Sequence, residues 1–466
     1  MYRCTCLRAL HTTSLQSGVF AFLLIVSIVL SPMRAGAETE PRYVVFQLGV
    51  ESDEPVKPQL PGLVGEIKDC FGAPTADAER YVGFTPGLLF SLNLPVETLH
   101  SRVVQALDIA EETGMPVFFH LDDMHFWWKR TELHSDPECV EWSGFPAPGE
   151  ESGPVIERYW LNWGSFVVFP APPPNFESPR FRKDVTHQLT EGIGKPIAQR
   201  LERWRASGKA YLFAGIAVGN ETELPYDLRP LLNTPEGAEP VGHDSTQPPP
   251  GEVKMRRDEM VRGGYHALYM RGYTQEKVER LAKDAGQSVD EVVSELRHEA
   301  AHDYAEIRAR VLSEAGLPKE RIYTHFVSSM RPFIEKRMGA PMVDRFPRVR
   351  HSVNAYSRPG YTLTREMTYL PDLLAEIRSA RAVSGGDLGT AWAGVETYCA
   401  VGQPGCPQTR EEYEAYLGGL FANDMRLINV YGWNGPPDNP FSSRNAPGVV
   451  EAIQNWLSGL RLCVSI

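Results

Sequence analysis

The sequence predicts an α/β fold, a (β/α)8 TIM barrel with long loop insertions. Amphipathic helical segments alternate along the 466-residue chain with short apolar strands, an order that implies parallel strands joined by crossover helices. No glycine-rich phosphate loop follows the first predicted strand, residues 43–49, which argues against an open nucleotide-binding sheet. A closed barrel with insertions accounts best for the number of such units over this length.

The elements follow from apolar spacing and from residues that stop helices. Each predicted helix carries apolar residues at helical spacing, and the first three end at glycine shortly before the next strand begins. After the strand 43–49, the predicted units in chain order are helix 101–113 with strand 117–121, helix 197–207 with strand 211–218, helix 288–316 with strand 322–326, a short helix around 373–377 with strand 390–395, a helix from 409 with strand 426–431, and a last helix over 449–457.

Two of these helices are expected to begin with a capping box. Ser288 is followed three residues later by Glu291, and Thr409 is followed at the same distance by Glu412. In this motif the first side chain accepts from the backbone of the third helical residue, and the acid reaches back to the cap. The remaining length is assigned to two insertions, near 123–185 and 222–270. Long loops in a barrel often form the sides of its active site.

The N-terminus has the layout of a secretory signal peptide. Arg3 and Arg8 precede an uncharged apolar run over 19–30, and Ala35-Gly36-Ala37 follows as an A-x-A cleavage site. We therefore expect residues 1–37 to be removed and 38–466 to form the catalytic domain, secreted or periplasmic, without a stable membrane span. An uncleaved signal anchor is the alternative.

Composition excludes several classes of protein. Apolar residues make up 42% and charged residues 23%, as in a globular chain, and a mean hydropathy of −0.29 excludes a multi-span membrane protein. The net charge of −12 argues against a nucleic-acid partner. In an oxidising compartment, Cys399 and Cys406 flank a short loop and are expected to form a disulfide.

Polar residues follow several predicted strands, where a barrel carries its chemistry. Asn220-Glu221 and Glu396 each place a carboxylate directly after an apolar strand. Two carboxylates at one barrel mouth are what glycosidic bond cleavage requires, because one must donate a proton while the other is ionised. Asp122 and Asp123 end another strand and are candidates for binding sugar hydroxyls. The aromatic residues expected at this rim, as faces on which sugar rings would stack, are Trp127, Trp128, Trp392 and Trp433.

On Asn220-Glu221, Glu396 and Trp433 the sequence resembles the retaining glycoside hydrolases of clan A, a large (β/α)8-barrel group. The resemblance implies Glu221 as acid/base, Glu396 as nucleophile, Asn220 as ligand of the sugar 2-hydroxyl and Trp433 as a platform. Tyr356 is the candidate for the tyrosine that hydrogen-bonds the nucleophile. The two glutamates are 175 positions apart, which is long for the clan, and the early-strand arginine of the clan has no identified counterpart.

This interpretation predicts a glycosidase that acts on an oligosaccharide or polysaccharide, with β-linkage favoured, and it requires no cofactor. Two alternatives remain open. His120, Asp122 and His125 are metal-ligand types that could activate water at the barrel mouth, although their spacing matches no hydrolase signature. The other is a barrel that binds carbohydrate without catalysis, which would need the aromatic rim but not both glutamates.

Overall fold

The computed structural model describes residues 40–459, apart from gaps that include parts of both predicted insertions. The gaps are 50–55, 77, 92, 123–126, 157–159, 163–166, 170, 220–228, 231–262, 327–353, 364–387, 398–406, 408 and 435–447. The predicted signal peptide, the short helix around 373–377 and the pair Cys399 and Cys406 therefore lie outside the described residues.

Eight parallel strands close into a barrel, which confirms the predicted fold class. They pair in the order β2-β1-β12-β11-β10-β9-β7-β4, and β4 returns to β2. The barrel strands are β1 (Arg42–Gln47), β2 (Arg80–Thr85), β4 (Val117–Asp122), β7 (Phe213–Val218), β9 (Ile322–Phe326), β10 (Arg358–Leu363), β11 (Trp392–Thr397) and β12 (Met425–Val430).

The barrel closes where β2 meets β4, and a glycine allows the approach. Phe84 pairs with Val117, and its backbone N–H donates to the carbonyl of Pro116 over 2.9 Å. A Cβ on the preceding residue, Gly83, would lie 2.1 Å from that carbonyl oxygen, so a larger residue would hold the two strands apart. A short strand, β3 (Leu88–Phe90), then continues the pairing along β4.

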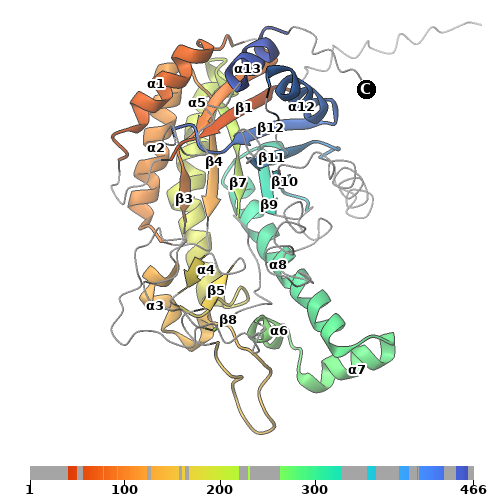
Figure 1. The fold of residues 1–466 in the computed structure, drawn as a ribbon. Coiled ribbons are helices and arrows are strands. Elements are labelled where there is room, and N and C mark those ends of the chain that lie inside the picture. Colours follow the sequence, from red (N-terminus) through yellow and green to blue (C-terminus); the bar gives the residue numbers. More distant parts are fainter. Residues whose placement is uncertain are drawn as a thin grey trace, which may run out of the picture. The chain divides into compact units, whose positions relative to one another are not determined.

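Helices lie between the strands along the chain and cover the barrel (Figure 1). Both predicted capping boxes are present, at the starts of α8 and α12, and α2 ends at Gly114 in the left-handed conformation. The helices between barrel strands, with one after the last, are α1 (Leu60–Phe71), α2 (Val96–Thr113), α4 (Pro179–His187) continued through a π-helical turn into α5 (Lys195–Ala206), α8 (Val289–Glu314), α12 (Arg410–Ala422) and α13 (Val449–Leu457).

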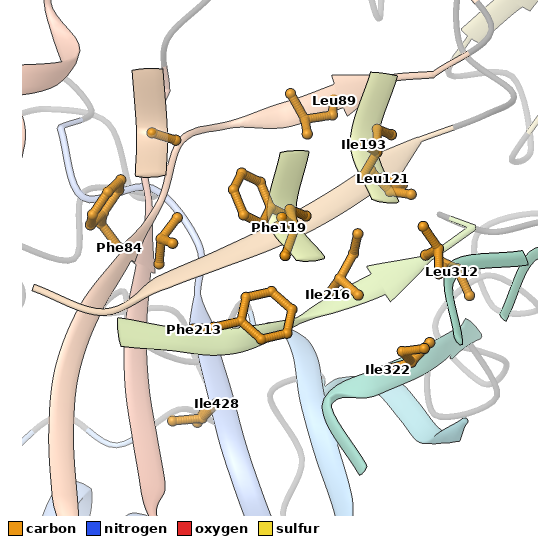
Figure 2. Packing of buried hydrophobic residues seen from close by; sticks show 14 of the residues in the cluster. Phe84, Leu89, Phe119, Leu121, Ile193, Phe213, Ile216, Leu312, Ile322 and Ile428 are labelled. Carbon is orange, nitrogen blue, oxygen red and sulfur yellow. The ribbon is translucent and has the colours of Figure 1, made fainter. Parts of the chain in front are cut away.

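The main hydrophobic core lies between the barrel wall and these helices (Figure 2). The helical layer contributes Leu312 of α8 and Ile193 of the π-helical turn. The barrel wall contributes outward-pointing side chains to this core: Phe119 and Leu121 of β4 and Ile216 of β7. Their neighbours along each strand point inward, because successive side chains of a strand alternate between its two faces. The alternation therefore decides which residues line the barrel interior.

The barrel interior changes from aromatic and apolar to polar along its axis. Near the amino ends of the strands, Tyr43, Tyr81 and Tyr323 are buried, and the Tyr43 hydroxyl donates to the carbonyl of Tyr211 over 3.2 Å. Small and apolar residues follow, including Ala217 and Leu427. The next inward positions, near the carboxyl ends, carry polar side chains.

Further elements lie outside the barrel. The segment between β4 and α4 contains α3 (Thr131–His134), β5 (Trp160–Asn162) and β6 (Val167–Phe169), and β5 pairs with β8 (Arg229–Pro230) in a small antiparallel sheet. Two helices, α6 (Tyr265–Met270) and α7 (Gln275–Ala285), precede α8.

Two barrel strands, β2 and β10, carry no clear signal in the sequence. Strand β10 contains Pro359 and Gly360, residues that usually weaken a strand. Residues 354–357 lead into β10 without strand structure of their own.

Candidate active site

A ring of buried polar side chains occupies the barrel interior near the carboxyl ends of its strands. Every member is 5% exposed or less. Seven of the eight strands contribute one side chain each, and we call the set the polar ring: Gln47 (β1), Thr85 (β2), His120 (β4), His325 (β9), Thr362 (β10), Glu396 (β11) and Asn429 (β12).

Glu396 reaches this ring because of a β-bulge. Tyr361 pairs with Gly394 but the next residue, Thr362, pairs with Glu396, so Val395 is an extra residue in β11. The bulge places Glu396 on the same inner face as Thr362, which simple alternation from Ala393 would not do. Gly360 makes room for it, since a Cβ there would lie 2.7 Å from Cγ1 of Val395.

One half of the polar ring runs from Glu396 to His120. The Thr362 hydroxyl lies 3.1 Å from Glu396 Oε2 and 2.7 Å from His325 Nε2. The other nitrogen of His325, Nδ1, is 3.2 Å from His120 Nε2. His325 Nε2 is also 3.7 Å from Glu396 Oε2. These contacts link one carboxylate to two imidazoles through a single hydroxyl.

The other half returns from His120 to β11. His120 Nδ1 is 3.4 Å from Gln47 Oε1, which also accepts from Asn429 Nδ2 over 3.0 Å. Asn429 Nδ2 donates in addition to the backbone carbonyl of Val395 over 2.8 Å, and Asn429 Oδ1 accepts from the Thr85 hydroxyl over 2.9 Å. Each interior amide is therefore fixed by more than one partner.

The remaining strand, β7, contributes a small residue at this level. Ala217 pairs with His120 in the strand register and belongs to the interior apolar cluster. Because it is small, His120 on β4 and His325 on β9 can meet although β7 lies between their strands.

Burial decides the charge of the two histidines. Desolvation lowers the pKa of His120 from 6.5 to about 4, with the nearby Asp122 opposing it. Burial and the neighbouring His120 lower the pKa of His325 well below its ordinary value. Taken by itself, each imidazole is neutral at physiological pH.

The structure brings together some of the predicted site residues. Glu396 and Asp122 both lie inside the barrel, 3% and 0% exposed. Asp122 is two positions beyond His120 on β4 and therefore on the same face, further toward the carboxyl end. Asn220, Glu221, Asp123 and His125 lie outside the described residues, and so does the side chain of Trp128.

The described aromatic candidates are not placed as a sugar-stacking rim, since each indole is 0% exposed. Trp127 packs edge-on to Phe181 in the outer core and donates through Nε1 to the carbonyl of Pro172. Trp392 opens β11 at its amino end and donates to the carbonyl of Asn423.

Trp433 follows β12, and its ring centre lies 4.6 Å from that of Phe46 and 6.1 Å from that of Phe71 in the outer core.

Tyr356 does not lie where a partner of Glu396 is needed. It is half-buried just before the amino end of β10, where the ammonium of Lys319 stands 4.5 Å from its ring centre. Thr362, near the other end of the same strand, makes the hydrogen bond to Glu396 instead.

Sequence reasoning missed most of the polar ring. Gln47 and Asn429 are polar residues near the ends of predicted apolar strands, and this position was the available signal. Thr85 and Thr362 could not be found in this way because their strands, β2 and β10, were not predicted. His325, whose two ring nitrogens face His120 and Thr362, is a further member that sequence reasoning did not place in the site.

Within the described ranges, no group of three or more His, Cys, Asp or Glu side chains is arranged to hold a metal ion. Both nitrogens of His120 are engaged by Gln47 and His325. Among the described helices, none combines the length and apolar character needed to cross a membrane.

No family model and no curated protein sequence matches this chain. Among solved structures, a β-galactosidase from the psychrophilic Marinomonas ef1 is similar at 12% identity and a TM-score of 0.46, covering 90% of this chain and 59% of that one. A β-galactosidase from the Antarctic haloarchaeon Halorubrum lacusprofundi is 13% identical with a TM-score of 0.43, covering 90% and 57%.

The catalytic domain of a β-amylase from Paenibacillus polymyxa is 8% identical with a TM-score of 0.45, covering 91% of this chain and 99% of that one. The chain thus spans less than two thirds of the two β-galactosidases.

Proposed function

We propose that this protein is a secreted retaining glycosidase that cleaves β-linked oligosaccharides or polysaccharides. The observation that carries the proposal is the position of Glu396, whose carboxylate a β-bulge turns into the barrel near the strand ends, against the Thr362 hydroxyl. Burying an ionised carboxylate costs free energy. A carboxylate with a purely structural role would not need to lie near the carboxyl ends of the barrel strands, where barrel enzymes carry their active sites.

In the proposed reaction, Glu396 attacks the anomeric carbon while Glu221 protonates the departing glycosidic oxygen. The C–O bond to the leaving group breaks as the bond to the Glu396 carboxylate forms. Water then attacks the glycosyl ester, Glu221 takes a proton from that water, and the Glu396 carboxylate is released. No cofactor takes part in these steps.

Substrate binding is proposed for the polar residues at the strand ends. Asp122 lies on the same strand face as His120, further toward the carboxyl end, where it would accept from sugar hydroxyls. Asp123 and Asn220 are proposed to contribute in the same way, with Asn220 at the 2-hydroxyl. The buried tryptophans Trp127, Trp392 and Trp433 are assigned to packing rather than to sugar stacking.

The test is hydrolysis of a panel of aryl β-glycosides by the purified protein, with and without chelator. The variants are Glu221→Ala and Glu396→Ala, with Glu150→Ala as a control because Glu150 is an exposed carboxylate outside the barrel. We expect activity that survives the chelator and the control change but falls by roughly a thousandfold or more in both other variants.

Azide distinguishes the roles of the two glutamates, because a small anion can replace a missing carboxylate. Glu221→Ala should give a glycosyl azide with the configuration of the substrate, and Glu396→Ala one with the opposite configuration. Anomeric protons in the NMR spectrum of the first product should report retention. Loss of activity in the presence of chelator would favour a metal site at His120, Asp122 and His125 instead. Binding of sugars without hydrolysis of any of them would favour the non-catalytic carbohydrate-binding alternative.

A further inference from the structure

The donors and acceptors of the polar ring can be assigned from one fixed point. The backbone carbonyl of Val395 only accepts, so the Asn429 group facing it at 2.8 Å must be the amide nitrogen. That nitrogen donates its second hydrogen to Gln47, which fixes Gln47 Oε1 as the acceptor at 3.0 Å. The Thr85 hydroxyl, which donates to Asn429 Oδ1, holds the same orientation from the other side.

The assignment continues through both histidines. Because Gln47 Oε1 is an acceptor, favourable contact requires a hydrogen on His120 Nδ1. A neutral His120 then has only a lone pair on Nε2, so His325 must carry its hydrogen on Nδ1. A neutral His325 in turn accepts at Nε2, and the described group that faces this nitrogen at 2.7 Å is the Thr362 hydroxyl.

Thr362 has one hydrogen but two partners that would need it. If the hydroxyl donates to His325, its 3.1 Å contact with Glu396 is favourable only when the carboxyl carries a proton. If it donates to an ionised Glu396, His325 must donate from Nε2, and one of the two histidines must then be doubly protonated. In either case these four side chains together hold one proton more than they would with an ionised Glu396 and two neutral imidazoles.

We propose that Glu396, Thr362, His325 and His120 form a single titrating unit that shares this one exchangeable proton across the barrel. The proton resides on Glu396, or moves by way of Thr362 to His325 and onward to His120. His120 and His325 thereby act as positioning residues, which set the charge of Glu396 without touching the substrate.

The transfer balances in three proton steps. Glu396 gives its proton to the Thr362 oxygen, and Thr362 gives its own hydrogen to His325 Nε2. His325 then gives its Nδ1 hydrogen to His120 Nε2, while His120 keeps the hydrogen on Nδ1 that faces Gln47. Glu396 ends as a carboxylate and His120 as an imidazolium, with no proton gained or lost by the unit.

The surroundings bias where the proton lies. Burial lowers the pKa of both histidines, which favours the proton on Glu396 in the resting protein. Asp122 on β4 is the described charged group near His120, and it favours the imidazolium. The strands β1, β2, β7 and β12 place uncharged residues around the unit: Gln47, Thr85, Ala217 and Asn429.

The catalytic consequence rests on the proposed function, whereas the proton count does not. A nucleophile must be ionised when it attacks, and a buried carboxylate is costly to ionise alone. Passing the proton to His120 would ionise Glu396 while keeping the unit electrically neutral. The proton would remain on the histidines while the glycosyl ester exists and could return when the ester is hydrolysed.

The direct test is NMR of the ¹⁵N-histidine-labelled protein, joined to infrared spectroscopy of its carboxyl groups. Asn substitutions of His120 and His325 assign the two signals among the 12 histidines. We expect one of two results at neutral pH. Either both imidazoles are neutral with hydrogen on Nδ1, and a carboxylic-acid band disappears in Glu396→Gln, or one of them is doubly protonated.

Two neutral imidazoles with His325 protonated on Nε2, and no carboxylic-acid band removed by Glu396→Gln, would overturn the proposal. On raising the pH, the histidine signals and the carboxyl band should change together, at one midpoint. Thr362→Val should separate these midpoints, and Thr362→Ser, which keeps the hydroxyl, should bring them back together. Midpoints that stay joined in Thr362→Val would also refute the relay.

Neither readout uses turnover, so a failed relay leaves the glycosidase proposal standing. Conversely, an inactive protein that shows the shared proton would refute only the function.

Discussion

Two buried carboxylates in this protein are held in opposite ways. Glu396 lies in the polar ring, where its described hydrogen-bond partner is the hydroxyl of Thr362. Glu141 lies outside the barrel, between β4 and α4, where it is 0% exposed and its described partners are backbone N–H groups. Both sites combine a carboxylate with a nearby histidine, but they differ in whether protons can move.

The Glu141 site joins two segments that are far apart in the chain. Its Oε2 accepts from Gly264 and His266 over 3.1 Å each and from Trp142 over 3.3 Å, and its Oε1 accepts from Ala267 over 3.2 Å. The imidazole of His266 stacks on Trp142 with ring centres 3.7 Å apart. Desolvation outweighs the backbone donors and the nearby charge of Arg297, and it raises the pKa of Glu141 to about 7.

The two sites differ in whether the groups around the carboxyl can exchange protons with it. Backbone N–H groups are fixed donors that cannot accept a proton in return, so the surroundings of Glu141 can hold a segment but cannot relay charge. The side chains around Glu396 each have a hydrogen that can move or a lone pair that can receive one. The first arrangement suits structure and the second suits chemistry.

The largest expected effect is on activity at Glu396. Glu396→Gln keeps the shape of the side chain but removes the proposed nucleophile, so kcat/KM should fall by roughly a thousandfold or more. The amide can still donate to Thr362, as the protonated carboxyl would, and the melting temperature should therefore change little. Aryl-glycoside kinetics and thermal unfolding of the same preparation measure both. A large loss of stability would make Glu396 a structural residue like Glu141.

The second prediction reverses this pattern at Glu141. Glu141→Ala leaves four backbone donors without their carboxylate, and we expect the free energy of unfolding to fall by about 3 kcal/mol. Denaturant unfolding measures it, and kcat/KM should stay within a few-fold of the wild type where the variant is folded. Glu150→Ala, an exposed acid on the same segment, should stay within about 0.5 kcal/mol.

Local signals in the sequence predicted the fold well and the site only in part. Capping boxes at Ser288 and Thr409 are short-range patterns, and both are present in the structure. The strand β10 carries Pro359 and Gly360, so its local pattern argues against a strand although its neighbours pair with it.

The site depends on relations that a local pattern does not contain. Glu396 follows an apolar run, so its location at a strand end could be predicted, but its inward direction comes from a bulge defined by pairing with β10. The contact of His120 with His325 spans 205 positions in the chain and requires the closed barrel. Trp127, Trp392 and Trp433 were expected at the rim but are buried, because the sequence alone does not distinguish a rim aromatic residue from a buried one.

The third prediction concerns the pH dependence of stability. A carboxyl whose pKa is raised from 4.5 to about 7 on folding stabilises the protein fully below pH 4.5, and this contribution is lost as pH rises through 7. The stability of the wild type relative to Glu141→Gln should therefore fall by roughly 3 kcal/mol over that interval. The two buried histidines act in the opposite direction, because their lowered pKa values cost stability as pH falls below 6.5.

Denaturant unfolding of the wild type and Glu141→Gln at a series of pH values isolates the Glu141 contribution, since the histidines are common to both proteins. A difference that stays constant between pH 4.5 and pH 7.5 would show that the carboxyl is ionised throughout that range. The backbone donors would then outweigh burial, and the contrast between the two sites would become stronger.

The smallest expected effect tests the one strand that adds no polar group to the ring. Ala217→Val adds two methyl groups at the residue that pairs with His120, where the His120–His325 contact crosses β7. We expect a loss of about 1–3 kcal/mol in stability from overpacking, and a fall in kcat/KM of roughly tenfold to a hundredfold as the relay is displaced. Ala214→Val adds the same volume to the interior cluster three residues earlier. If turnover depends on the contact between His120 and His325, Ala214→Val should lower the stability but leave kcat/KM unchanged. Equal losses of turnover in both variants would mean that general packing of β7, rather than the alignment of the two histidines, supports Glu396.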